Sequence, residues 1–325
     1  MKNIIAATLT TLLIGLGFYQ VNLDSASDFE RWALKHGKSY YGDEKIYRQT
    51  IYYQNKQMID QHNKRNDITY QMAENQFMTI TNEEFIRLYL NTKSTEQLND
   101  QDKVKRNNIH QSSEPINKEN KKWPIDWRGL VKVKNQGSCP SSYAMSATSV
   151  VEAKYAIDKG ISITLSAQQV VDCQWLNDGC DPNDGRNSAL MALRYIRLYG
   201  LYNEYQYPYS GETQSCQLND NGPWKIADYW MWTDNYWYNF QRHLEKQPIS
   251  MKVDASKWQF YGSGIFSDCT SNSNYYALAV GYDSSDNWFV QASFGTTWGE
   301  SGYIRLAPGN TCGILDYFWQ VVLYN

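Results

Sequence analysis

The stretch Asn135–Ala144 reads NQGSCPSSYA and leads into a run of small and apolar residues. Pro140 suits the first turn of a helix, because that turn leaves its backbone N–H groups unpaired in any case. The pattern predicts a helix over Ser142–Lys159 that ends at Gly160, a typical C-terminal residue. A second helix is predicted over Ala189–Leu198. This part of the chain is therefore expected to be helical.

Short strand-like runs follow in the last hundred residues, separated by turn residues. They are Ile249–Val253, Tyr276–Tyr282, Asn287–Gln291 and Tyr303–Leu306. A helical half followed by a strand-rich half predicts an α+β fold.

The chain before this body divides into three segments. Residues 1–17 are interpreted as a signal peptide, because the apolar run is too short for a bilayer span; an uncleaved anchor is the alternative. Residues 28–92 lack Cys and Pro and show helical periodicity, with Ile51, Asn55 and Ile59 on one face. Residues 93–122 are a polar linker, and residues 123–325 form the body.

Charge and cysteine content restrict the class of protein. The chain has 325 residues, with Lys+Arg 31 and Asp+Glu 34, a balance that argues against a nucleic-acid partner. The six cysteines indicate three disulfides in a secreted chain, with 15 connectivities open, and a zinc site is the weaker interpretation. We expect no metal, no cofactor and no membrane span after signal cleavage. The secretory pathway is the expected route, ending in a lysosome, a vacuole or the extracellular space.

Several motifs in the right order resemble the papain family, and most closely its cathepsin L-like members. They are Asn135–Ala144, Leu165–Cys173, Tyr207–Gly211 and Gly295–Arg305. Upstream, the spaced residues Glu44, Arg48, Tyr52, Asn55, Ile59 and Asn63 are similar to the family's inhibitory propeptide. The resemblance implies a two-part fold, a helical half plus a β-barrel-like half, preceded by a helical propeptide domain that lies in the cleft. It also implies the disulfides Cys139–Cys180, Cys173–Cys216 and Cys269–Cys312.

The catalytic positions of the family are occupied by other residues here. Ser142 stands at the nucleophile position, Tyr275 at the histidine position and Ala292 at the asparagine position, while the oxyanion-hole residue Gln136 is retained. A serine hydroxyl needs a positioned base to take its proton, and no such base is evident in the sequence. A purely architectural role is the alternative for Gln136. Pro182 also replaces a glycine at which substrate backbone docks in the family.

These substitutions predict a pseudoprotease that is not an enzyme and acts as a binding, regulatory or scaffold protein with a protein or peptide partner. One alternative is a weak or altered peptidase that uses Ser142, and another is a structural matrix protein. In the propeptide, Thr79 replaces the usual acidic residue, which puts pH-triggered processing in question.

One aromatic segment lies outside the motifs that resemble the family. Residues 229–240 read YWMWTDNYWYNF. An exposed platform for a glycan or a partner protein is one interpretation. The favoured interpretation is a strand over Tyr229–Trp232, with Trp230 and Trp232 on one sheet face, followed by a helix start whose aromatics pack inward.

Overall fold

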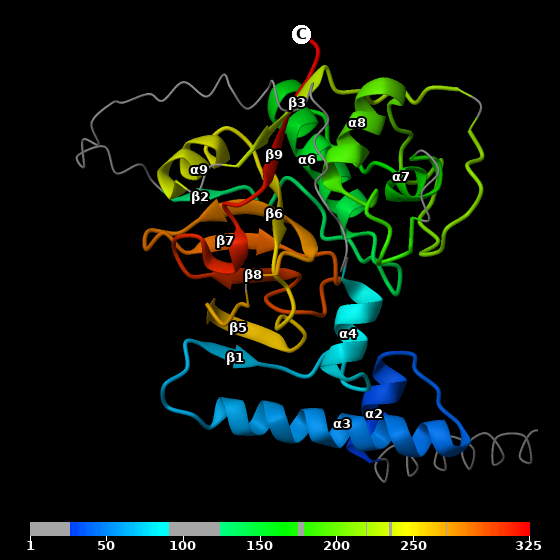
Figure 1. The fold of residues 1–325 in the computed structure, drawn as a ribbon, viewed down its shortest axis with the longest axis vertical. Helices are drawn as coiled ribbons and strands as arrows, with labels where there is room; N and C mark the ends of the chain where they lie inside the picture. The colour runs from blue at the N-terminus through cyan, green and yellow to red at the C-terminus, as the bar shows by residue number, and fades with distance from the viewer. Residues whose placement is uncertain (1–26, 91–123, 175–178, 219, 234–235, 271) are drawn as a thin grey trace, which may run out of the picture.

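A computed structural model describes residues 27–90, 124–174, 179–218, 220–233, 236–270 and 272–325 (Figure 1). The predicted signal peptide and the whole of the predicted linker lie outside these residues. The elements are α2 (Asp28–Lys35), α3 (Gly42–Asn63), β1 (Tyr70–Met72), α4 (Asn82–Tyr89), β2 (Ile125–Asp126), α6 (Ser142–Lys159), α7 (Ala167–Cys173), α8 (Ala189–Tyr199), β3 (Asp228–Trp232), α9 (Trp237–Leu244), β4 (Ile249–Val253), β5 (Tyr261–Phe266), β6 (Tyr275–Tyr282), β7 (Trp288–Gln291), β8 (Tyr303–Leu306), a 3-10 turn (Thr311–Gly313) and β9 (Phe318–Val322).

The first four elements form the propeptide part, which lies across the lower end of the molecule in Figure 1. Ser27 and Thr81 each complete a capping box, which satisfies free N–H groups at the starts of α2 and α4. Helix α3 buries Ile51 and Ile59, as its periodicity predicts. The Asn55 amide donates to the carbonyls of two residues near the end of this part, Met78 at 2.9 Å and Ile80 at 3.0 Å. The Asn55 side chain on this helix face therefore connects α3 to the segment before α4 by hydrogen bonds.

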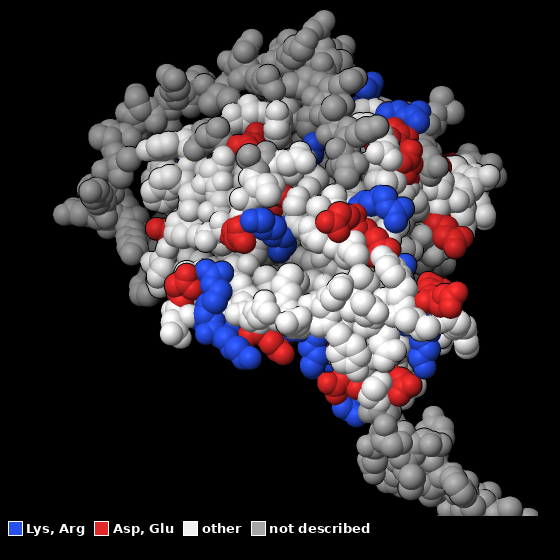
Figure 2. Space-filling view, turned by 60° about the horizontal axis from the view of Figure 1, so that its bottom comes forward, with Lys and Arg blue, Asp and Glu red and all other residues white. Residues whose placement is uncertain are grey.

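Charged side chains join the propeptide elements to one another. Arg48 of α3 pairs with Glu84 of α4 at 2.8 Å, and Lys56 pairs with Glu74 at 2.8 Å. Figure 2 turns this end of the molecule forward and shows acidic and basic side chains interspersed across it. The charge on that face is therefore mixed in sign.

Helix α6 is the centre of the helical half. All of its residues from Ser142 to Ala153 are buried, and it packs on α7, α8 and the sheet strand β6. Gly160 ends the helix with a φ of 66°, a left-handed conformation that glycine adopts without strain. The helix therefore has the bounds that the sequence predicts.

The strands form one sheet in the order β1-β5-β8-β7-β6-β4-β9-β3, with β2 paired to β6. All eight residues of β6 are buried, because the helical half covers one face and a second apolar core covers the other. The propeptide strand β1 joins the sheet at its edge, antiparallel to β5, with Tyr70 opposite Gly264. The α+β fold predicted from the sequence is confirmed.

Three disulfides close loops in the body. They are Cys139–Cys180, Cys173–Cys216 and Cys269–Cys312, the pairs that the family resemblance implies. The first joins the start of α6 to the segment that contains Pro182 and Asn183.

The aromatic segment forms the predicted strand and helix, but its packing prediction is wrong in two respects. In β3 it is Tyr229 and Met231 that are buried, whereas Trp230 is 37% exposed. At the start of α9, Trp237 and its two tyrosine neighbours are also partly exposed, at 38–44%. Large apolar residues occupy both faces of this strand, so the alternation did not indicate which face is inward.

Candidate functional site

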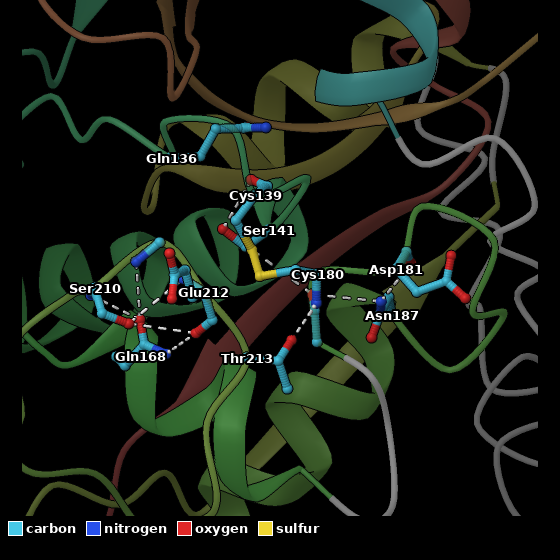
Figure 3. The surroundings of a disulfide bond; sticks show 12 residues. Gln136, Cys139, Ser141, Gln168, Cys180, Asp181, Asn187, Ser210, Glu212 and Thr213 are labelled. Atoms are coloured by element: carbon cyan, nitrogen blue, oxygen red, sulfur yellow. Dashed lines mark hydrogen bonds between the residues drawn. A yellow bond between two sulfur atoms is a disulfide. The ribbon is translucent and has the colours of Figure 1, made fainter.

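The loop before α6 carries Gln136, the residue from which the site is built. Its backbone N–H donates to the Ser293 carbonyl at 2.8 Å, and Asn135 makes a β-bridge with Phe294. Figure 3 shows Gln136, Cys139 and Ser141 following one another around the start of α6, with Cys139 joined to Cys180. The loop is thus fixed both to the sheet and by a disulfide.

Ser142 is the first residue of α6 and is completely buried. Its hydroxyl oxygen accepts a hydrogen bond of 3.2 Å from the backbone N–H of Tyr276. A helix N-terminus favours negative charge on a nearby atom, so the position itself suits a nucleophile. The neighbouring Ser141 hydroxyl lies 2.7 Å from the Tyr209 hydroxyl, and burial raises the pKa of Tyr209 to about 12.

Tyr275 is the first residue of β6, next to the residue that contacts Ser142. Its hydroxyl lies 2.7 Å from the Ser293 Oγ and accepts a 2.8 Å bond from the Ser293 N–H. Burial raises the pKa of Tyr275 above its ordinary value, against smaller lowering effects of the Ser293 bonds. The phenol therefore stays neutral at physiological pH and is not a base there.

The Ser293 hydroxyl then donates to the Gln136 Oε1 at 2.8 Å. A continuous hydrogen-bonded chain thus runs from Tyr275 through Ser293 to Gln136. Ala292 is buried beside it and offers no polar side-chain group. The adjoining cavity is only about 10 Å³, room for about one water molecule.

The structure brings all four predicted site residues together: Gln136, Ser142, Tyr275 and Ala292.

The propeptide part reaches this same place. The Gln136 Nε2 donates to the backbone carbonyl of Tyr89, the last residue of α4, at 2.9 Å. Gln76 Nε2 donates to the Phe294 carbonyl at 2.7 Å, and Asn75 Nδ2 donates to the Gln259 carbonyl at 2.7 Å. The predicted placement of the chain's own propeptide over the site is what the structure contains.

Aromatic rings fill the space between propeptide and body. Phe294 makes edge contacts with Phe77 and Phe85, at ring-centre distances of 5.4 and 5.7 Å, and lies 4.8 Å from the ring of Tyr275. Such ring pairs stabilise the interface beyond the effect of buried apolar area alone.

The sequence reasoning did not identify Ser293, Tyr89 or Gln76 as site residues. Their contacts join the propeptide part to the body, and such contacts carry no local sequence signal.

No group of three or more His, Cys, Asp or Glu side chains that could hold a metal ion occurs within the described ranges. In the same part of the chain, no helix is long and apolar enough to cross a membrane.

The fold and the site define a papain-like protein with its inhibitory propeptide, and sequence comparison agrees. Residues 122–321 match the papain family cysteine proteases, and residues 29–85 match the cathepsin propeptide inhibitor domain. The chain therefore belongs to the papain family.

Individual relatives give the same result. The chain is 47% identical to a putative cathepsin L 3 of Paramecium tetraurelia over 99% of this chain and 100% of that protein. It is 34% identical to a cathepsin L-like proteinase of Fasciola hepatica, over 88% and 90% of the two chains. Among solved structures, digestive procathepsin L 3 of Tenebrio molitor superposes with a TM-score of 0.79 at 32% identity, covering 92% of this chain and 100% of that one.

These relatives contradict the sequence-based prediction that the chain is not an enzyme. The family is one of cysteine proteases, and relatives at up to 47% identity carry cathepsin L names. The prediction inferred the absence of any activity from three side chains alone, those of Ser142, Tyr275 and Ala292, and that inference was wrong.

Proposed function

We propose that this papain-family protein acts as a binding, regulatory or scaffold protein in a form that keeps its propeptide docked over the site. One observation carries the proposal: the Gln136 amide, a donor suited to a peptide carbonyl, is already bonded to the carbonyl of Tyr89 at 2.9 Å. A ligand peptide that used this donor would first have to displace the propeptide. Binding by this form is compatible with hydrolysis by a processed form.

A second candidate function is peptide hydrolysis after removal of the propeptide, favoured by the cathepsin L names of the relatives. In this case Ser142 would act as the nucleophile at the helix N-terminus. The reaction needs a group that takes the serine proton, and the neutral Tyr275 phenol does not supply one. Rearrangement of the site on processing is therefore part of this candidate.

We further propose the secretory pathway as the route, with a lysosome, a vacuole or the extracellular space as the destination. The apolar segment within residues 1–17 and three disulfides support this route. Fusing residues 1–30 to a reporter enzyme and measuring its secretion tests it, and a reporter that stays in the cytosol contradicts it.

The function is tested with the intact chain held between pH 4 and pH 7. Mass spectrometry measures whether residues 27–90 stay attached, and a fluorogenic peptide mixture measures turnover in the same samples. The proposal expects the propeptide to remain attached and docked throughout. Loss of residues 27–90 within this pH range would overturn the proposal, because the docked form would not persist. Turnover that Ser142→Ala abolishes would support hydrolysis by a processed form.

A further inference from the structure

The chain of hydrogen bonds from Tyr275 to the propeptide has a fixed direction. The Ser293 hydroxyl has one proton, and it donates that proton to the Gln136 Oε1. The Tyr275 hydroxyl must then donate to the Ser293 oxygen, which lies 2.7 Å away, while it accepts from the Ser293 N–H. Each proton in the series therefore has one assigned partner.

This direction determines which end of the Gln136 amide faces the propeptide. Because Oε1 accepts from Ser293, the Nε2 group must point the other way, towards the Tyr89 carbonyl that it meets at 2.9 Å. A flipped amide would place an oxygen against the carbonyl and an N–H against the Ser293 hydroxyl. The full burial of Gln136 makes such a mismatch costly, since water cannot satisfy the groups that lose their partners.

We propose that Tyr275 and Ser293 are positioning residues for the Gln136 amide, and that together they hold the Tyr89 carbonyl of the propeptide on the body. The Tyr275 ring supports the same contact from the apolar side, because it packs on Phe294, which in turn contacts Phe77 and Phe85. One tyrosine thus orders both the polar and the aromatic side of the interface. The inference goes beyond the proposed function, because it assigns a binding role to individual side chains whether or not a processed form is active.

The test is local hydrogen exchange of the intact chain at residues 75–90, compared with exchange in β4 and β6. Tyr275→Phe keeps the ring and removes only the hydroxyl, and Ser293→Ala interrupts the chain directly. One hydrogen bond corresponds to roughly three- to tenfold in an opening equilibrium. We expect exchange at residues 75–90 to accelerate by about that factor in both variants. Tyr195→Phe is the matched control, because Tyr195 is also buried and bonded to a glutamine amide, that of Gln169, but in the helical half.

A double-variant cycle separates positioning from simple loss of stability. In a Gln136→Met background there is no amide to orient, so Tyr275→Phe should no longer accelerate exchange at residues 75–90. The same acceleration in both backgrounds would overturn the proposal. So would uniform acceleration across β4, β6 and residues 75–90, which would make Tyr275 a core residue only. Ser293→Ala in the Gln136→Met background gives an independent second reading if either Tyr275→Phe protein fails to fold.

Discussion

Phe85 is the side chain whose removal should most weaken the contact between propeptide and body. It is completely buried in α4, and its ring lies 5.0 Å from that of Phe77, 5.8 Å from that of Tyr89 and 5.7 Å from that of Phe294. Replacing a buried phenylalanine by alanine costs about 3–5 kcal/mol, including the cavity that is left. Only Phe294 among these partners belongs to the body, so the cavity would open on the interface itself.

The expected result of Phe85→Ala is selective release of α4. Since about 1.4 kcal/mol corresponds to a factor of ten, exchange at residues 75–90 should accelerate by at least about 100-fold. Protease accessibility of the same residues should rise in parallel. Tyr41→Ala is the control, because it removes an aromatic ring of the propeptide that is 82% exposed, and it should change exchange less than threefold.

Two results would refute this reasoning. Exchange at residues 75–90 that stays within threefold of the wild type would show that the ring does not hold the interface. Equal acceleration in β6 would show that the substitution destabilises the whole chain rather than the docked helix.

Three further predictions concern charge, backbone and covalent constraints. Burial is the largest single effect on Glu84 and raises its pKa, but the hydrogen bonds from Arg48 and from the Thr81 backbone N–H, with the positive charges of Arg48 and Arg87, together lower the pKa overall. The ion pair therefore stabilises the propeptide above a pH of about 4.3, and this contribution is lost as the pH falls below that value. Glu84→Gln should weaken protection at pH 7 and flatten its loss in acid, and a wild-type pH profile retained by the variant would contradict this. Gly281→Ala would place a Cβ 2.0 Å from a backbone oxygen of β2, at a φ of 155°, and should lower the free energy of unfolding, measured in urea, by more than about 2 kcal/mol. The control Gly129→Ala adds a Cβ in open space and should leave the free energy of unfolding nearly unchanged. Removing the Cys269–Cys312 disulfide by a double alanine substitution should cost about 2–5 kcal/mol in the same assay, and a cost below about 1 kcal/mol would count against its structural role.

The sequence was sufficient where one physical signal dominates. The start of α6 follows from Pro140 and its end from Gly160, and β4 and β8 have the bounds expected from their apolar runs. The site residues Ser142, Tyr275 and Ala292 were located by the resemblance of the surrounding motifs to the papain family, and the fold brings them together.

The sequence was insufficient where contacts join distant segments. The bond from Gln136 to Tyr89 spans 47 residues and two parts of the chain, and neither residue has a local pattern that indicates it. Ser293 was missed because its role is to link the Tyr275 hydroxyl to the Gln136 amide, a contact that no local pattern indicates. The exposure of Trp230 in β3 was missed because Trp230 and its buried neighbours are equally apolar.

The strand β1 has a consequence for what processing would do to the surface of the body. It pairs with β5 at one end of the sheet, where the Ile265 N–H also donates to the Thr69 carbonyl at 2.7 Å and the Ala73 N–H donates to the Phe260 carbonyl at 2.9 Å. Removing the propeptide would leave this edge of β5 with donors and acceptors that have lost their partners. An open strand edge is a template for pairing with another chain, so cleavage would convert a self-capped sheet into one that can associate with a second molecule.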